Sequence, residues 1–484
     1  MTAVANEEAE LKLELAPDSA DQLEASGLFA GEPALIPQHA IYFDTPDHDL
    51  SKAGLSLRVR RDGSKRVQTV KADGPSAGMF IRPEWERPVP DDEPIIDHTT
   101  PIPALLGDRI ASLSPVFTVD NERRLWVQDG IEITLDRGHV IAAERETPVC
   151  EVELELKEGS AAALFALARR IDAIAPVRIG VSSKAERGYR LLGPAPTATK
   201  APRVVLETEM DAGKAFQAIA AACLRHFRLN EPLVLDHRDG AALHQSRVAI
   251  RRLRSALTLF KTLFPDETRR RFNGELRWLA GELGKARDLD VLADQASEGP
   301  LLNRITTARD DAYLGAIAAL DSRRARMLML DLSEWLVIGD WLTDEDRRAL
   351  RETTAREFAA NALERFRRKV KKGGRRLEKL DDHARHEVRK TAKKLRYATD
   401  FFVALFPEKR ERRRHKRFVS ALEELQDRLG LLNDLVGAPE LLDNLGLADA
   451  PEATHLLGHD KKADLLEAAA EAYETFVDAK RFWR

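Results

Sequence analysis

Charged side chains alternate with apolar ones in several short segments of the first part of the sequence. The first such segment carries Glu8, Glu10 and Lys12, separated by Ala9 and Leu11. In an extended strand every second side chain points to the same face, so these three charges would share one face and the apolar residues the other. The pattern recurs in further segments, with Arg58 and Arg60, with Glu84 and Glu86, and with Glu151, Glu153 and Glu155.

Such segregated charge has two interpretations. A sheet whose charged face meets water explains any single strand. The full set separates carboxylates from arginines by strand, which favours ligand binding. Carboxylate oxygens suit Mg²⁺ or Mn²⁺, and arginine forks suit phosphate. A sheet closed with these charges inward would be costly unless cations and a polyanion neutralise them. We therefore predict an enclosed site for metal ions and a phosphate chain.

A second pattern, of basic residues, occurs twice in the later part of the sequence. Each copy begins with a histidine and continues with cations 3, 7, 8 and 10 residues later: His244, Arg247, Arg251, Arg252 and Arg254 in the first, and His386, Arg389, Lys393, Lys394 and Arg396 in the second. On a helix the residues at spacings 0, 3, 7 and 10 form one narrow stripe, in which like charges repel. A solvated helix face explains one such stripe, whereas the duplication favours an anionic ligand.

The stripe contains few aromatic residues that could stack on bases, and no nucleic-acid reading motif accompanies it. This argues against sequence-specific nucleic-acid binding and favours a linear polyanion. A Leu-Gly pair also follows each stripe, as Leu283-Gly284 in the first copy and Leu429-Gly430 in the second. This second repeat supports a duplicated helical bundle.

The elements that must position these residues change type near residue 200. Before it, short alternating runs punctuated by Gly, Pro and Asp indicate strands; after LLGPAPTATKAPRVV, apolar residues recur three and four apart, as in helices. Residues 1–200 carry 23 Lys+Arg against 33 Asp+Glu, and the remainder carries 53 against 47. We predict a multi-domain α+β protein with a β domain at 1–198 and an all-α domain at 205–484.

The sequence contains no apolar run long enough for a membrane span, and its start lacks the features of a signal peptide. Cys150 and Cys223 are too few for a disulfide framework or a thiolate zinc site. We therefore expect a cytoplasmic protein that makes no membrane contact.

The motifs of the first part occur in an order that resembles the CYTH domains, also called triphosphate tunnel metalloenzymes. They are the Glu8-x-Glu10-x-Lys12 start, YFDTP from Tyr42, LSLRVR, TVKA, the Glu84 and Glu86 pair, LDRG, EVELELKEG and SSKAERGY. The resemblance covers nearly all of residues 1–195. It implies an eight-stranded antiparallel tunnel with flanking helices.

The resemblance also implies roles for individual residues. A triphosphate would be held by Arg58, Arg60, Lys71, one of Arg123 or Arg124, Lys184 and Arg187. Mg²⁺ or Mn²⁺ would be held by Glu8, Glu10, Asp136, Glu153 and Glu155. Glu8, Glu10 and Lys12 would act in catalysis, with Lys12 either orienting water or a phosphate or serving as an internal counter-ion for Glu10.

The duplicated helical part, from about residue 205 to 484, resembles the CHAD domains, which occur next to CYTH domains in bacteria. This resemblance implies two related four-helix bundles whose basic surface, including both stripes, binds inorganic polyphosphate. The leading hypothesis is a metal-dependent inorganic triphosphatase that converts tripolyphosphate to pyrophosphate and phosphate and associates with polyphosphate. The alternatives are a non-catalytic polyphosphate-binding adaptor and an enzyme for an organic triphosphate such as thiamine triphosphate or a nucleoside triphosphate.

Overall fold

The computed structural model describes residues 9–72, 79–80, 83–444, 446 and 462–484. Contacts divide the chain into two compact units. The sheet unit consists of Met1–Ala198 and Ser322–Ile338, and the helical unit consists of Thr199–Asp321 and Gly339–Arg484. The chain thus leaves the sheet unit, returns to it once, and leaves it again.

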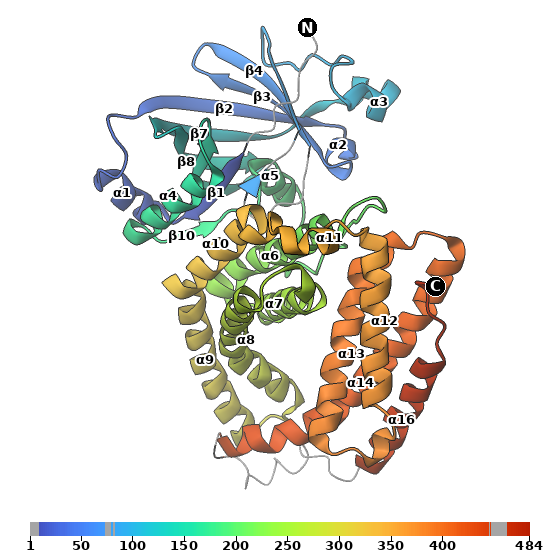
Figure 1. The fold of residues 1–484 in the computed structure, drawn as a ribbon. Helices are drawn as coiled ribbons and strands as arrows, with labels where there is room; N and C mark the ends of the chain where they lie inside the picture. The colour runs from blue at the N-terminus through green and yellow to red at the C-terminus, as the bar shows by residue number, and fades with distance from the viewer. Residues whose placement is uncertain (1–8, 73–78, 81–82, 445, 447–461) are drawn as a thin grey trace. The chain divides into compact units, whose positions relative to one another are not determined.

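The sheet unit is built on ten strands in the order β10-β1-β9-β8-β7-β2-β3-β4-β6, with β5 paired to β1 (Figure 1). All the pairings are antiparallel. In chain order the strands are β1 Glu10–Leu15, β2 Ala34–Asp44, β3 Leu55–Asp62, β4 Lys65–Ala72, β5 Met79–Phe80, β6 Glu84–Pro88, β7 Ser114–Gln128, β8 Ile131–Ala142, β9 Arg145–Leu156 and β10 Val177–Ile179.

The antiparallel sheet confirms the predicted fold class. Eight of its strands have five or more residues, and β5 and β10 are shorter additions. β5 lies in the chain between β4 and β6 yet pairs with β1, near the other end of the strand order.

The long strands β7 and β8 are joined by a two-residue turn, Asp129–Gly130. Both residues have positive φ, 52° and 75°. An Asp-Gly pair suits such a turn because its backbone matches the twist of the strands that it joins. The turn fixes the register of β7 on β8, and therefore decides which side chains of the two strands share a face.

The apolar face of the sheet is covered by helix α4, Ala161–Ile174. Leu11, Val152 and Leu154 in the strands are fully buried, as are Phe165 and Ile171 in the helix. Ser160 caps the helix by accepting a hydrogen bond from the Ala162 amide at 3.3 Å. Since the apolar face packs outward against a helix, the charged face of the same strands points to the inside of the curved sheet.

Smaller helices complete this unit. They are α1 Pro17–Ala25, α2 Asp49–Lys52, α3 Ile102–Leu106 and α5 Lys184–Leu192. Helix α10, Arg323–Ile338, also belongs here and contacts α4 and β10. The sequence prediction assigned residues 205–484 to the helical domain. The structure differs from this prediction in placing α10 in the sheet unit.

The helical unit contains two groups of four helices (Figure 1). The first is α6 Ala212–His237, α7 Gly240–Leu259, α8 Asp266–Gln295 and α9 Pro300–Asp321; the second is α12 Ala355–Gly373, α13 Asp382–Phe402, α14 Lys409–Asn444 and α16 Lys462–Asp478. The short α11, Arg348–Arg351, lies between them in the chain. Helices α7 and α13, which carry the two basic stripes, contact each other.

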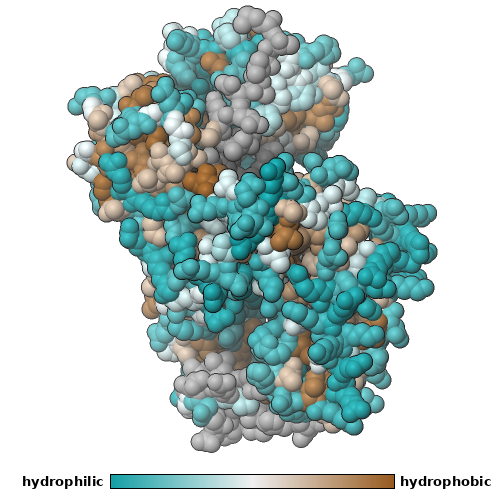
Figure 2. Space-filling model, in the orientation of Figure 1, coloured by the Kyte–Doolittle hydropathy of each residue, from teal (hydrophilic) through white to brown (hydrophobic). Residues whose placement is uncertain are grey.

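The visible surface is mostly hydrophilic, with scattered apolar patches (Figure 2). Within the described ranges, no helix combines the length and apolar content needed to cross a bilayer.

Candidate active site and basic helical surface

The inward face of the sheet surrounds a cavity of about 250 Å³, which we call the charged cavity. Its lining comes from strands on both sides of the curved sheet and from the start of α5. The basic lining residues are Lys12, Arg58, Arg60, Lys71, Arg123, Lys157 and Lys184. The acidic ones are Glu10, Glu84, Glu86, Glu132, Glu153 and Glu155. A site so densely charged with both signs is suited to ions rather than to apolar ligands.

Strand register explains how residues distant in sequence meet at this site. Glu10 on β1 lies opposite Glu155 on β9, which lies opposite Glu132 on β8. Lys12 lies opposite Glu153 in the same way. The side chains at such positions share one face. Three glutamates on three neighbouring strands therefore form one row, which we call the glutamate row.

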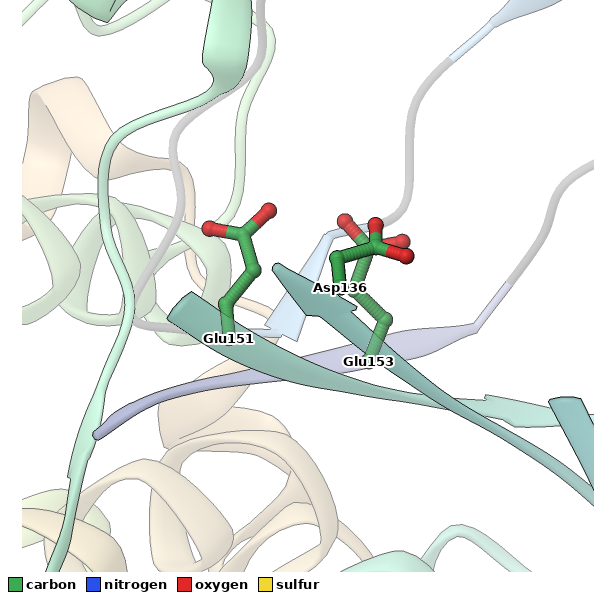
Figure 3. A group of neighbouring side chains, drawn as sticks. All are labelled: Asp136, Glu151 and Glu153. Carbon is green, nitrogen blue, oxygen red and sulfur yellow. The ribbon is translucent and has the colours of Figure 1, made fainter. Parts of the chain in front are cut away.

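A second group of acids lies deeper, and Figure 3 shows its members, Asp136, Glu151 and Glu153, on the strands of the sheet. One carboxylate oxygen of each lies within 4.8 Å of the others. Asp136 and Glu151 side chains are fully buried. Four basic side chains bind this group, which we call the acid cluster: Lys12, Arg123, Lys184 and Arg187.

Lys184 is central to the acid cluster. Its Nζ lies 2.7 Å from Asp136, 2.6 Å from Glu151 and 3.2 Å from Glu153. Arg123 makes a two-pronged contact with Asp136 at 2.8 and 2.6 Å and reaches Glu153 at 2.7 Å. Burial by itself would raise the pKa of Asp136, but Lys184 and Arg123 outweigh it and lower the pKa to about 2. The three carboxylates of the cluster are therefore ionised and paired with cations at neutral pH.

Lys12 also forms ion pairs with the acid cluster. Its Nζ lies 2.8 Å from Glu153 and 3.1 Å from Glu151. Burial works against its charge, but these two carboxylates outweigh burial and raise the pKa of Lys12. The structure thus gives Lys12 a counter-ion position, with Glu151 and Glu153 as its close partners.

The opposite side of the charged cavity is lined by Arg58, Arg60 and Lys71 together with Glu84 and Glu86. Burial works against the charge of Arg58, but Tyr42, Glu84 and Glu86 outweigh it and raise the pKa of Arg58. Arg58 is half-buried, and its Nε has no hydrogen-bond partner among the described residues. Its Nη1 donates to the Tyr42 hydroxyl at a long 3.5 Å. Burial lowers the pKa of Arg60, and repulsion from Arg58 and Arg123 lowers it further. Crowded, partly unpaired guanidinium groups of this kind are what an anion would stabilise.

Not every residue expected at the site lines the cavity. Arg124 lies on the opposite face of β7, where it pairs with Glu24 and, at 3.0 Å, with Glu122. Arg187 lies behind the acid cluster, 2.8 Å from Glu14 and 3.1 Å from Glu151. Lys71 lines the cavity and pairs with Glu84 at 2.6 Å. Glu8 lies outside the described residues.

The structure also adds residues that motif reading missed as site residues. Tyr42, Glu132, Thr134 and Lys157 all line the charged cavity. Thr134 is buried, and its hydroxyl has no hydrogen-bond partner among the described residues. Glu151 was recognised as part of a charged strand face but not as a partner of the predicted lysines. These residues can be assigned to the site only when the pairing register between the strands is known.

In the helical unit, the two basic stripes are built alike. Arg247 on α7 lies against α8, where its Nη1 donates to the Ala280 carbonyl at 3.1 Å. A Cβ at Gly284 would lie 2.4 Å from that Nη1 atom, so the glycine provides the space. Gly430 on α14 faces Arg389 in the equivalent way, but a Cβ there would lie 3.5 Å from Nη2, an ordinary van der Waals contact. The arginine thus requires the glycine in the first half only.

The two stripes also lie close enough to repel each other. Burial lowers the pKa of His244 to about 4, with a further contribution from the cations Arg287, Arg251, Arg247 and, from the other bundle, Lys393. Burial, Lys390 and Arg254 lower the pKa of Lys394. Cations of both bundles therefore form one surface, which we call the basic surface.

Three of the predicted stripe residues have other contacts. Arg252 is buried between the bundles, 3.8 Å from Asp400 and 4.8 Å from the centre of the Phe401 ring. Arg396 lies 3.4 Å from the same Asp400. His386 is hydrogen-bonded through Nδ1 to the side chain of Asn433. Arg252 therefore joins the bundles rather than facing solvent.

Comparison with known proteins gives matches to two domain families. The CYTH domain model matches residues 6–189, and the CHAD domain model matches residues 218–443. An inorganic triphosphatase of Haemophilus influenzae is 31% identical over 207 residues, which cover 38% of this chain and 55% of that protein. The chain therefore spans about half the length of that relative.

Two further similarities extend into the helical part. An uncharacterised protein of Mycobacterium tuberculosis is 26% identical over 408 residues, 74% of each chain. The crystal structure of the CHAD domain from the plant Ricinus communis is 29% identical, with a TM-score of 0.49, and covers 59% of this chain and 98% of that one. The chain therefore contains a CYTH domain followed by a CHAD domain.

Proposed function

We propose that the sheet unit is a metal-dependent inorganic triphosphatase, which hydrolyses tripolyphosphate to pyrophosphate and phosphate. The observation that carries this proposal is the charged cavity, in which Arg58 and Arg60 face rows of carboxylates. The buried Nε of Arg58 has no hydrogen-bond partner among the described residues, and burial and neighbouring cations lower the pKa of Arg60. The similarity to an inorganic triphosphatase of Haemophilus influenzae supports the choice of substrate. Phosphoryl transfer needs mainly positioning and charge stabilisation, and this cavity offers both.

The substrate-binding residues would be Arg58, Arg60, Lys71, Arg123 and Lys184. Arg58 and Arg60 would bind first, because phosphate oxygens would satisfy the unpartnered Nε and relieve the repulsion between the two guanidinium groups. Arg123 and Lys184 are shared with the acid cluster, so they would stabilise negative charge without leaving their fixed positions.

We propose the glutamate row as the site of a divalent ion. Glu10, Glu132 and Glu155 would offer carboxylate oxygens from neighbouring strands, which suit Mg²⁺ or Mn²⁺, and Glu153 lies on the same face of β9. Bound metal would replace Lys157, which contacts both Glu132 and Glu155. The acid cluster fits a metal less well, because four basic groups already occupy its oxygens. Asp136 thus suits the role of a counter-ion rather than that of a ligand. When bound, a divalent ion supplies Lewis-acid stabilisation of phosphoryl oxygens.

The test is release of phosphate from tripolyphosphate, ATP and thiamine triphosphate by the full chain, with and without Mg²⁺ or Mn²⁺. We expect metal-dependent turnover, fastest with tripolyphosphate. Glu10→Gln removes one charge from the glutamate row and should lower kcat/KM by about 100-fold or more. Glu122→Gln is the matched control, because Glu122 is exposed and pairs with Arg124 away from the cavity.

Two other outcomes of this assay would each favour one of the alternative functions. Fastest turnover of ATP or thiamine triphosphate would favour an organic substrate. Binding without turnover of any triphosphate would favour a non-catalytic polyphosphate adaptor.

A second function, binding of inorganic polyphosphate, is proposed for the basic surface of the helical unit. The supporting observation is that cations from α7 and α13 lower one another's pKa across the two bundles. A linear polyanion would remove this repulsion without needing a base-reading motif.

A further inference from the structure

Helix α10 is part of the sheet unit although it lies inside the sequence range matched by the CHAD model. Two separate sets of ion pairs hold it against α4. In one, Arg169 of α4 contacts Asp331 at 2.6 Å and also Glu334. In the other, Arg326 of α10 contacts Asp172 of α4 at 2.6 Å through Nε and at 3.3 Å through Nη2.

The second pair reaches beyond the two helices. The Asp172 side chain is fully buried, and its Oδ1 also accepts a hydrogen bond from the Val177 amide at 3.2 Å. Val177 is the first residue of β10. One buried carboxylate therefore joins α10 to the beginning of a strand of the sheet.

Strand β10 leads directly to the charged cavity. The Gly180 amide, just after the strand, donates to the Lys12 carbonyl at 2.8 Å. A Cβ at Gly180 would lie 2.6 Å from Lys12 Cγ, so the lysine side chain rests on this glycine. Four residues further on, Lys184 begins α5, with Ser183 as its cap. The path of β10 thus sets the position of both Lys12 and Lys184.

We propose that Arg326 is a positioning residue for the charged cavity, acting through Asp172 and β10 on Lys12 and Lys184. As a statement about catalysis, this inference rests on the proposed triphosphatase function. It assigns a role in the CYTH reaction to a residue 137 positions beyond the end of the CYTH match at residue 189. The sheet unit is then complete only when the later part of the chain supplies α10.

The physical reason is that a buried carboxylate needs a partner. Without Arg326, the nearest remaining cation is Arg323, 3.6 Å away with a side chain that is 64% exposed. Asp172 would turn toward Arg323 and solvent, which would weaken its hydrogen bond to Val177. Arg169 offers a matched control: it also ties α4 to α10, but through Asp331 and Glu334 rather than through Asp172.

The experiment compares Arg326→Ala with Arg169→Ala in the full chain, using two readouts. The first is amide hydrogen exchange in the segment Val177–Gly180, which reports local opening. The second is kcat/KM for tripolyphosphate at a temperature where both variants are folded. We expect Arg326→Ala to speed exchange and lower kcat/KM by about ten-fold each, since small displacements of catalytic groups are costly. Arg169→Ala should leave both within about two-fold, and Arg326→Lys should restore part of the loss.

A double variant keeps the test valid if Arg326→Ala folds poorly. Asp172→Asn removes the buried charge while keeping an oxygen for the Val177 amide. In that background Arg326→Ala should change neither readout further, because coupled residues are not additive. A further loss of the same size would overturn the proposal, as would unchanged exchange in β10 or equal effects of Arg169→Ala. If the wild type hydrolyses no triphosphate, the proposed function fails, and hydrogen exchange alone decides whether Arg326 holds β10.

Discussion

Neighbouring residues of one strand have different roles in this protein because their side chains leave the sheet on opposite faces. Arg123 faces the charged cavity and binds Asp136, whereas Arg124 pairs with Glu24 and Glu122 on the outer face. The sequence predicted that one of the two would serve the site. Selecting Arg123 required the pairing of β7 with β8, which places Arg123 opposite Asp136.

The acid cluster shows where prediction from sequence ends at the residue scale. The alternation of charge in each strand was predictable, since it depends only on the two-residue period of a strand. The contact between Lys12 and Glu151 joins residues 139 positions apart and depends on register and on burial. Sequence therefore identified the charged faces but not which charges neutralise each other.

The acid cluster should also make the sheet unit sensitive to acid. Glu151, Glu153 and Asp136 have pKa values below their usual range, since nearby cations outweigh burial. Carboxylates with a lowered folded-state pKa stabilise the fold above the usual pKa of about 4, and this contribution is lost as pH falls toward the folded-state values. For Asp136, with a folded-state pKa of about 2, the loss is roughly 2 kcal/mol.

Urea unfolding of the sheet unit between pH 6 and pH 2 measures this effect. We expect the midpoint to fall steeply below about pH 4. Glu151→Gln should lower the midpoint at pH 6 and flatten the dependence on pH, whereas Glu158→Gln, at an exposed position on the loop after β9, should change neither. A wild-type midpoint that is constant over this range would contradict the ionised, paired state of the acid cluster.

At the scale of elements, the helical unit uses one helix design twice. Helices α7 and α13 begin with an aspartate cap, Asp239 and Asp381, each accepting a hydrogen bond at 2.7 Å from the amide three residues later. The caps have the same 142-residue separation as the stripes, so the repeat extends beyond the basic residues. The duplication could be predicted from the sequence because equal spacing between residues can be recognised without knowing how the helices pack.

Charge reversal on these helices tests the basic surface. Arg251→Glu combined with Lys393→Glu changes one residue on α7 and its repeat equivalent on α13. We expect the double variant to elute inorganic polyphosphate at much lower salt than the wild type, because fewer cations release counter-ions on binding. Tripolyphosphate turnover should be unchanged.

The matched control reverses two exposed arginines at the start of α14, Arg412 and Arg413. It makes the same change in net charge away from α7 and α13. Equal loss of polyphosphate retention in both double variants would mean that net charge, rather than the basic surface, holds the polymer.

At the scale of the whole molecule, more than one boundary in the sequence separates the sheet unit from the helical unit. The change of period near residue 200 predicted one boundary, whereas the sheet unit consists of two segments of the chain, the first of which is Met1–Ala198. Helix α10 returns to that unit from position 322 onward. Its sequence has an ordinary helical period, which shows that it has an apolar face but not which partner covers that face. Only tertiary contacts such as Arg326 with Asp172 show it.

The central claim is that the arginines of the charged cavity bind a triphosphate for hydrolysis. The most direct measurement is kcat/KM for tripolyphosphate with Mg²⁺ for wild type, Arg58→Ala and Arg61→Ala. Arg58 makes one long hydrogen bond among the described residues, so its removal should affect catalysis more than folding. Arg61 is exposed and lies on the other face of β3.

We expect Arg58→Ala to lower kcat/KM by about 100-fold or more and Arg61→Ala to leave it within about two-fold. Equal rates for the two variants, or no release of phosphate by the wild type, would contradict the account.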